Sequence, residues 1–123
     1  EDLEDKYILE VGSGAGKFTE ILLKTKAKIV TTDSSDSIKI NYDNNFKSGM
    51  NNIYFIKTNA NEIIFKKNIF DYVVLYGVLQ NVDDQEKIIK NCITHLKKGG
   101  KLIAIPIDKN INKPYIKKKY KLI

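Results

Sequence analysis

The stretch ILEVGSGAGKFTEIL, residues 8–22, joins an apolar run to a helical pattern through glycines at positions 12, 14 and 16. Glycine has no Cβ atom, so it adopts positive φ freely and lets the backbone come close to a ligand. A glycine-rich turn that leads from a buried strand into a helix is typical of nucleotide-binding sites. The stretch therefore predicts an α/β fold with a ligand site where its first strand ends.

Strand-like and helix-like segments alternate along the rest of the chain. Apolar and β-branched runs predict strands at residues 7–11, 28–32, 53–57, 70–76 and 101–107. Helical patterns occupy residues 17–24, 36–49 and 83–96. Strands joined by helices form right-handed βαβ crossovers, so we expect a Rossmann-like, doubly wound, mostly parallel sheet of about five strands, with helices on both faces.

The last two helical segments have definable ends and buried faces. Asp36 is placed to cap the first of them and Gly49 to end it. Its expected buried face consists of Ile38, Tyr42 and Phe46. The expected apolar stripe of the second consists of Ile88, Ile89, Cys92, Ile93 and Leu96. We expect the second helix to end with the cations and glycines of residues 97–100.

The composition narrows the class of protein. A chain of 123 residues predicts one domain, residues 1–123, and its basic residues are all lysines, with a net charge of +6. Because arginine dominates phosphate and base recognition, its absence makes a nucleic-acid partner unlikely. The single cysteine excludes an internal disulfide and a multi-cysteine metal site, and no apolar run reaches the roughly 20 residues of a membrane span. We expect a cytoplasmic protein, in which the lysines of residues 117–121 form a solvated tail or a contact patch.

Two common glycine-loop motifs fit the opening stretch poorly. A P-loop needs glycine at Val11 and a hydroxyl residue at Phe18, so this motif is excluded. The dinucleotide fingerprint needs its third glycine at Lys17, whereas the third glycine here is Gly16. A nicotinamide-binding module therefore stays open only as a variant of that motif.

The remaining pattern is an acidic residue followed by G-x-G-x-G, from Glu10 to Gly16. With it, the chain resembles the class I S-adenosylmethionine-dependent methyltransferases over about residues 6–107. The resemblance rests on five segments in the same order: ILEVGSGAGKFT, TTDSS, TNANEIIF, FDYVVLYGVLQNV and LKKGGKLIAI. It implies a methyltransferase whose cofactor is S-adenosyl-L-methionine and which has no metal site.

Ligands of such sheets bind at the carboxyl ends of the strands, where the candidate residues lie. The expected cofactor-binding residues are Glu10, Gly12, Ser13, Gly14, Gly16, Asp33, Ser34, Asn59, Ala60, Tyr76 and Gln80. Asp33, 21 residues after Gly12, can accept hydrogen bonds from both ribose hydroxyls. By the resemblance, Glu10 would help to organise the methionine end, and Asn59 would face the adenine amino group.

Each of these residues also has a purely structural interpretation. The glycines can serve close packing of helix and strand, and Asp33 can cap the following helix. Glu10 can be a buried hydrogen-bond partner. Tyr76 and Gln80 can be packing residues, since their neighbourhood is apolar.

Methyl transfer from a sulfonium needs alignment and dehydration more than acid–base chemistry. A general base is required only for a protonated nucleophile, and Asp108, after the last strand, is a weak candidate. His95 is interpreted as a helix-end residue and Cys92 as core.

The fourth-strand segment and the chain's length bear on the substrate. YGVLQN contains neither an Asn-Pro-Pro turn nor a Pro-Cys nucleophile, which favours an oxygen or nitrogen nucleophile of a small molecule. The resemblance implies two further strands, so we expect a core fragment whose pocket is completed by further domains or a partner chain. A catalytically silent cofactor-binding or assembly domain is the alternative.

Overall fold

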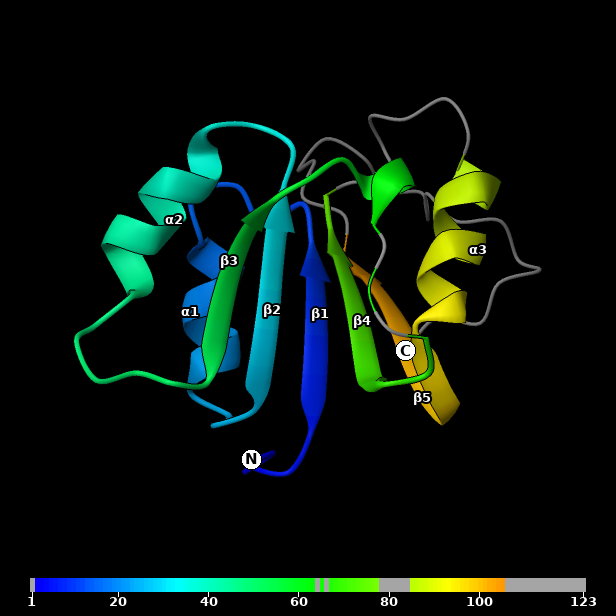
Figure 1. Cartoon of the computed structure of the whole chain (residues 1–123), viewed down its shortest axis with the longest axis horizontal. Coiled ribbons are helices and arrows are strands. Elements are labelled where there is room, and N and C mark those ends of the chain that lie inside the picture. The colour runs from blue at the N-terminus through cyan, green and yellow to red at the C-terminus, as the bar shows by residue number, and fades with distance from the viewer. Residues whose placement is uncertain (1, 64, 66, 78–84, 106–123) are drawn as a thin grey trace.

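The computed structural model describes residues 2–63, 65, 67–77 and 85–105. Within them one sheet contains β1 (Tyr7–Val11), β2 (Lys28–Asp33), β3 (Ile53–Lys57), β4 (Phe70–Tyr76) and β5 (Leu96–Ile105). The strand order is β3-β2-β1-β4-β5, and every neighbouring pair is parallel (Figure 1). Successive strands are added on one side of β1 as far as β3 and on its other side from β4, so the strand order reverses between β1 and β4, as in a doubly wound sheet. The predicted fold class is confirmed.

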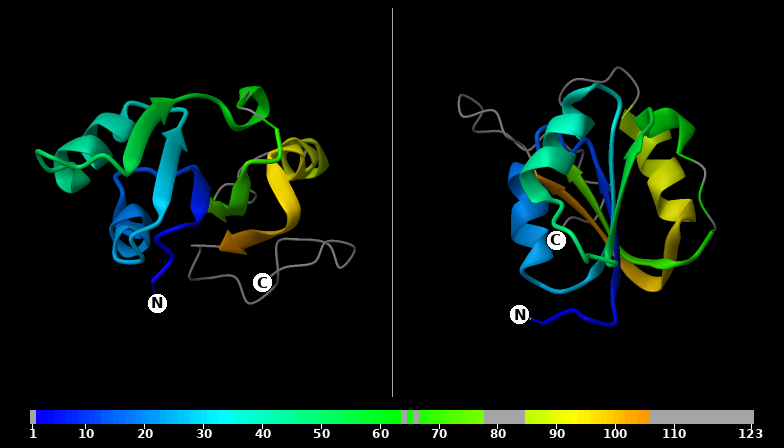
Figure 2. Two further views of the ribbon diagram at one scale, coloured as in Figure 1. Left: turned by 60° about the horizontal axis from the view of Figure 1, so that its bottom comes forward. Right: turned by 60° about the vertical axis from the view of Figure 1, so that its left-hand side comes forward.

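Helices cover both faces of the sheet. They are α1 (Lys17–Leu23), α2 (Ser37–Asn45) and α3 (Gln85–Thr94), with a short 3₁₀ turn, η1 (Ala60–Glu62), before β4. Helices α1 and α2 lie against one face and α3 against the other (Figure 2). None of these helices, in the part of the chain that the structure describes, is long and apolar enough to cross a membrane.

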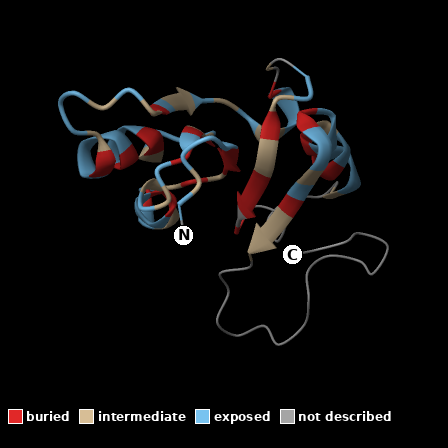
Figure 3. Ribbon diagram, turned by 90° about the horizontal axis from the view of Figure 1, so that it is seen from below, coloured by how far each residue is buried: buried red, intermediate tan, exposed pale blue. Residues whose placement is uncertain are grey.

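The alternation of side chains along β1 divides the core into two layers. Leu9 packs into the layer that contains Ile88 of α3, whereas Ile8 packs into the layer that contains Leu22 of α1. Buried residues line the strands and the helix surfaces that face them (Figure 3). Glu10 points to the same face as Ile8 and is buried there between β1, α1 and β2.

The predicted end of the third helix and the predicted start of the fifth strand were wrong. Helix α3 ends at Thr94, Ile93 is 49% exposed, and β5 already begins at Leu96, which pairs with Phe70. The Phe70 amide also donates to the His95 carbonyl, so β4 draws this segment into the sheet. Residues 97–100 therefore lie in an irregular part of β5 and do not form a helical stop. The start of the predicted helix and the end of the predicted strand, with Pro106, lie outside the described residues.

The predicted cap, stop and buried face of α2 also needed correction. Asp36 occupies the cap position, but its carboxylate accepts from Lys57 Nζ at 2.8 Å and makes no capping bond. The helix ends at Asn45 and not at Gly49, because Phe46 is already extended. The buried residues of α2 are Ile38, Asn41 and Asn45. Tyr42 is 45% exposed and stacks on Phe46, and these two rings together cover the ring of Phe55 at the sheet edge.

We predict that Cys92, the single cysteine, is unreactive in the folded protein. Its side chain is 1% exposed in the core of α3, and burial raises the pKa of its thiol to about 12. Because the thiolate is the reacting species, a disulfide reagent at mildly alkaline pH should modify the protein only at its rate of unfolding. Absorbance of the released thiol, with and without urea, measures this rate. Rapid modification without urea would contradict the burial of Cys92.

Candidate functional site

The glycine loop connects the end of β1 to α1 and is attached to β2. The amides of Gly12 and Ser13 both donate to the Thr32 carbonyl, each at 2.9 Å. Gly12, Gly14 and Gly16 have φ values of +79°, +56° and +97°, which L-residues with a Cβ rarely adopt. The loop is thus held against the sheet in a conformation that depends on its glycines.

Gly14 and Gly16 have different surroundings. A Cβ atom at Gly14 would meet no atom within 4 Å, so this part of the loop faces open space. A Cβ atom at Gly16 would overlap the side chains of Asn41 and Asn45. Gly16 therefore serves close packing against α2, whereas Gly14 leaves room for a ligand.

Asp33 ends β2 beside the loop and is half-buried. Its Oδ1 accepts from the Gly14 amide at 3.1 Å, and its Oδ2 accepts from the Ser35 amide and hydroxyl at 3.0 and 2.6 Å. The carboxylate thus joins the loop to the turn after β2 and does not cap α2, which begins at Ser37. Two carboxylate oxygens have about four acceptor positions, so Asp33 can accept further hydrogen bonds. Ser34 is exposed beside it.

The segment after β3 lies next to Asp33. The Thr58 amide donates to the Asp33 carbonyl at 2.9 Å. Asn59 is exposed, and its Oδ1 accepts from the Asn61 amide at 2.9 Å, which caps η1. Ala60 is half-buried and packs against the core layer of α3. The predicted residues after β1, β2 and β3 are therefore brought to one edge of the sheet.

Glu10 lies in the core beneath the loop and is 0% exposed. Its Oε1 accepts from the hydroxyls of Thr19 at 2.5 Å and Thr31 at 2.7 Å, while its Oε2 has no partner among the described residues. Burial raises the pKa of the Glu10 carboxyl; the two hydroxyls offset part of this rise, and the charge of Asp33 adds to it. Each contact that the structure gives Glu10 fits the interpretation as a buried hydrogen-bond partner.

The remaining candidates divide into those the structure places and those it does not. Tyr76 ends β4, where its backbone pairs with Ile105, but Gln80, Asp108 and the lysines of residues 117–121 lie outside the described residues. His95 directly follows α3 and is 3% exposed. Its Nε2 accepts from the Phe65 amide at 3.1 Å, so its Nδ1 carries the proton and donates to the Asn91 carbonyl at 2.9 Å. His95 thus joins the segment before β4 to α3.

Several residues of this region were not predicted from the sequence. Thr19, Thr31, Asn41 and Asn45 are buried polar residues that contact Glu10, Ser13 or Gly16. The sequence signal of the two asparagines is their 3–4 spacing with Ile38, which matches a buried helix face. In the described part of the chain, no group of three or more metal-ligating side chains is present.

We predict that Glu10 makes the stability of the protein depend on pH. The pKa of Glu10 is raised in the folded state. Its contribution to folding stability is therefore fully present below pH 4.5 and is lost as the pH rises through the folded-state pKa. The stability of the wild type relative to Glu10→Gln should therefore fall as pH rises above 4.5. Urea denaturation across a pH series measures this difference, with exposed Glu20→Gln as the control. A difference that stays constant with pH would contradict the raised pKa.

Comparison with known proteins gives the family. A family model described as a methyltransferase domain matches residues 9–104. The ubiquinone/menaquinone biosynthesis C-methyltransferase of Vibrio cholerae is 31% identical over an alignment of 116 residues that covers 89% of this chain and 44% of that protein. The ubiquinone biosynthesis O-methyltransferase of Coxiella burnetii is 31% identical over 108 residues, 88% of this chain and 46% of that protein. The chain thus spans less than half the length of these curated relatives.

Solved structures share the fold. An S-adenosylmethionine-dependent methyltransferase from Aquifex aeolicus has a TM-score of 0.74 at 20% identity, over 89% of this chain and 62% of that one. Phosphoethanolamine N-methyltransferase 1 of Haemonchus contortus, in complex with phosphoethanolamine and S-adenosylhomocysteine, has a TM-score of 0.72 at 24% identity, over 80% and 22% of the two chains. Because the family model matches well over half of its residues, the chain belongs to the methyltransferase-domain family, which confirms its resemblance to the class I S-adenosylmethionine-dependent methyltransferases.

Proposed function

We propose that this domain binds S-adenosylmethionine at the carboxyl ends of β1, β2 and β3. The observation that carries the proposal is the hydrogen bond between Asp33 and the Gly14 amide, 3.1 Å long. It joins an acidic residue at the end of one strand to a glycine loop at the end of the neighbouring strand. A carboxylate and an open backbone surface are thereby held side by side.

The chemistry of these residues fits the cofactor. The two ribose hydroxyls of an adenosyl group are hydrogen-bond donors. Among the described residues, three of the roughly four acceptor positions of Asp33 are used, so one is open to a hydroxyl, and a second becomes open when the Ser35 hydroxyl turns away from Oδ2. The open space at Gly14 lets the backbone approach the cofactor without a side chain between them. Asn59 lies exposed after β3, where its second acceptor position is available to an adenine amino group.

We further propose that the complete protein transfers a methyl group to an oxygen or nitrogen nucleophile of a small molecule. When bound, the cofactor supplies a methyl group activated by the sulfonium. The contribution of this chain is to hold the adenosyl end through Asp33 and to fix the loop around Gly14, which reduces the entropy of aligning the reactants. Small-molecule acceptors are supported by the names of the ubiquinone-biosynthesis and phosphoethanolamine relatives. The acceptor pocket is assigned to the remainder of the protein or to a partner chain.

We predict that Asp33→Ala lowers the affinity for S-adenosylhomocysteine about 100-fold, because two hydrogen bonds to a charged acceptor are worth about 3 kcal/mol together. Calorimetric titration measures the affinity, and Asp36→Ala removes the same charge three residues away as a control. For a 2′-deoxyadenosyl analogue, the difference in affinity between the wild type and Asp33→Ala should be smaller, since the analogue lacks one of the hydroxyls.

Two outcomes of this titration, and two of a methyl-labelling experiment, would count against the proposals. Unchanged affinity in Asp33→Ala would remove Asp33 from the site. Binding of NADH in place of S-adenosylhomocysteine would identify a nicotinamide-binding module. Binding without transfer of a labelled methyl group into a metabolite extract by the complete protein would identify a catalytically silent domain, and a labelled carbon would replace the proposed oxygen or nitrogen acceptor.

We also predict that Gly14→Ala weakens cofactor binding more than it destabilises the fold. Gly14 and Gly49 both have positive φ, +56° and +92°, and neither would place a Cβ within 4 Å of another atom. Each alanine variant should therefore lose about 1 kcal/mol of unfolding free energy. Only Gly14→Ala should lose affinity for S-adenosylhomocysteine, by about tenfold or more, because its methyl group occupies the space left for the ligand. Equal affinities of the two variants would show that the open face at Gly14 is not the binding surface.

A further inference from the structure

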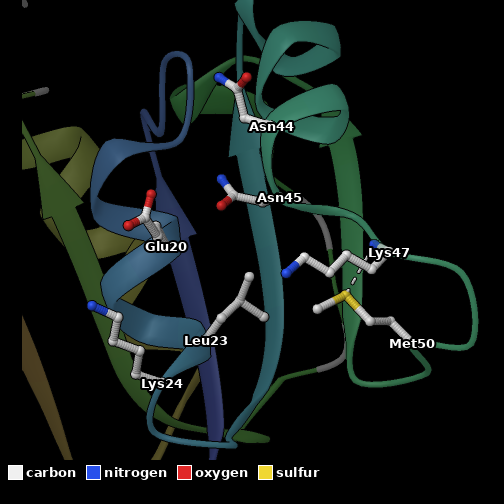
Figure 4. Close-up of a pocket in the computed structure, with 7 residues that line it drawn as sticks. All are labelled: Glu20, Leu23, Lys24, Asn44, Asn45, Lys47 and Met50. Carbon is white, nitrogen blue, oxygen red and sulfur yellow. Dashed lines mark hydrogen bonds between the residues drawn. The ribbon is translucent and has the colours of Figure 1, made fainter.

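The buried face of α2 is polar where it meets the glycine loop. Asn41 is 0% exposed and Asn45 is 6% exposed, although a helix normally buries apolar residues at such positions. Asn44 and Asn45 line the groove between α1 and α2, on the side of α2 that faces α1 (Figure 4). A buried amide is costly unless its hydrogen bonds are made, so the partners of these asparagines indicate what they hold.

The partners are residues of the glycine loop. Asn41 Nδ2 donates to Ser13 Oγ at 3.1 Å, and Asn45 Nδ2 donates to the Gly16 carbonyl at 3.0 Å. Asn44 Nδ2 donates to the Ala15 carbonyl at 3.1 Å. Three asparagines of one helix therefore hold three of the five residues of the loop.

The same asparagines join the loop to the buried carboxyl group below it. Asn41 Nδ2 also donates to Thr19 Oγ1 at 3.0 Å, and Thr19 donates to Glu10. Asn45 Nδ2 donates to Asn41 Oδ1 at 2.7 Å, which fixes the orientation of the Asn41 amide. Asn41 thus lies at the centre of a network that includes β1, α1, α2 and the loop.

This network has a consequence for the ligand site. A loop with three glycines loses much backbone entropy when it adopts one conformation, so its order must come from outside contacts. Helix α2 follows Asp33 after three residues, and Asp33 contacts the loop at Gly14. Fixing α2 to the loop from below therefore also fixes the position of Gly14 relative to the Asp33 carboxylate.

We propose that Asn41, supported by Asn45, is a positioning residue of the cofactor site: it fastens the glycine loop to α2 and so sets Gly14 and Asp33 in place for the ligand. Asn41 is fully buried and acts through the loop without touching the cofactor. The effect on binding rests on the proposed function, whereas the effect on the ligand-free loop does not.

The test compares Asn41→Leu, Asn45→Ala and Asn44→Ala in the complete protein. Asn41→Leu keeps the side-chain volume and removes every hydrogen bond of the amide. Asn52→Ala is the matched control, because Asn52 Nδ2 donates to the Ala27 carbonyl at 3.1 Å, at the opposite end of the strands. Hydrogen exchange of the loop amides without ligand is measured by NMR, with amides of β4 as the reference for global unfolding.

In Asn41→Leu and Asn45→Ala, we expect the Gly14 and Gly16 amides to exchange at least tenfold faster than in the wild type, after correction for the change in β4. In Asn44→Ala the acceleration should be smaller. The affinity for S-adenosylhomocysteine should fall about tenfold in the first two variants and stay unchanged in Asn52→Ala. If Asn41→Leu does not fold, Asn45→Ala at the rim of the network decides the result.

Loop exchange that follows β4 in every variant would overturn the positioning role. The role would also be overturned if the wild type binds S-adenosylhomocysteine and the variants show accelerated loop exchange but the same affinity. The order of the loop would then serve stability alone. If the wild type does not bind S-adenosylhomocysteine, the proposed function fails, and the exchange of the ligand-free loop still decides whether Asn41 holds it.

Discussion

The carboxyl group of Glu10, buried beneath the glycine loop, is the constraint on which this half of the molecule depends. A buried carboxyl must be hydrogen-bonded, and Glu10 receives the hydroxyls of Thr19 and Thr31. Thr19 in turn accepts from Asn41, so one acidic residue in β1 requires polar residues in α1, β2 and α2. Directional hydrogen bonds are thus added to the apolar contact that Leu22 of α1 makes with the sheet. These bonds leave little freedom in how the loop above them is placed.

The glycines of the loop serve two purposes that the motif alone does not separate. Gly16 is needed below the loop, where the side chains of Asn41 and Asn45 leave no room for a Cβ atom. Gly14 is needed above it, where the space is open and its amide reaches Asp33. The packing interpretation of the motif therefore holds at Gly16, while Gly14 has the open space that the proposed ligand site requires.

Strands and the glycine turn could be predicted because their signals are local: apolar runs for β1 to β4 and a fixed spacing for the loop. Asp33 could be placed because parallel strands end at one edge of the sheet. The buried face of α2 was predicted wrongly, because aromatic residues were expected in the core. Tyr42 and Phe46 cover Phe55 at the sheet edge instead, and Asn41 is buried against Thr19. The early start of β5 depends on its pairing with β4, which no local pattern contains.

The region that this chain shares with its curated relatives does not by itself indicate the methyl acceptor. The C-methyltransferase of Vibrio cholerae and the O-methyltransferase of Coxiella burnetii are both 31% identical to this chain, although their names specify different acceptor atoms. The likeness of this chain to both therefore does not distinguish between their acceptor atoms. The loop, Asp33 and the α2 asparagines lie on the β1–β2 side of the point where the strand order reverses. The cofactor site proposed there would orient the donor of the methyl group and would leave the opposite side of the switch point to select the nucleophile.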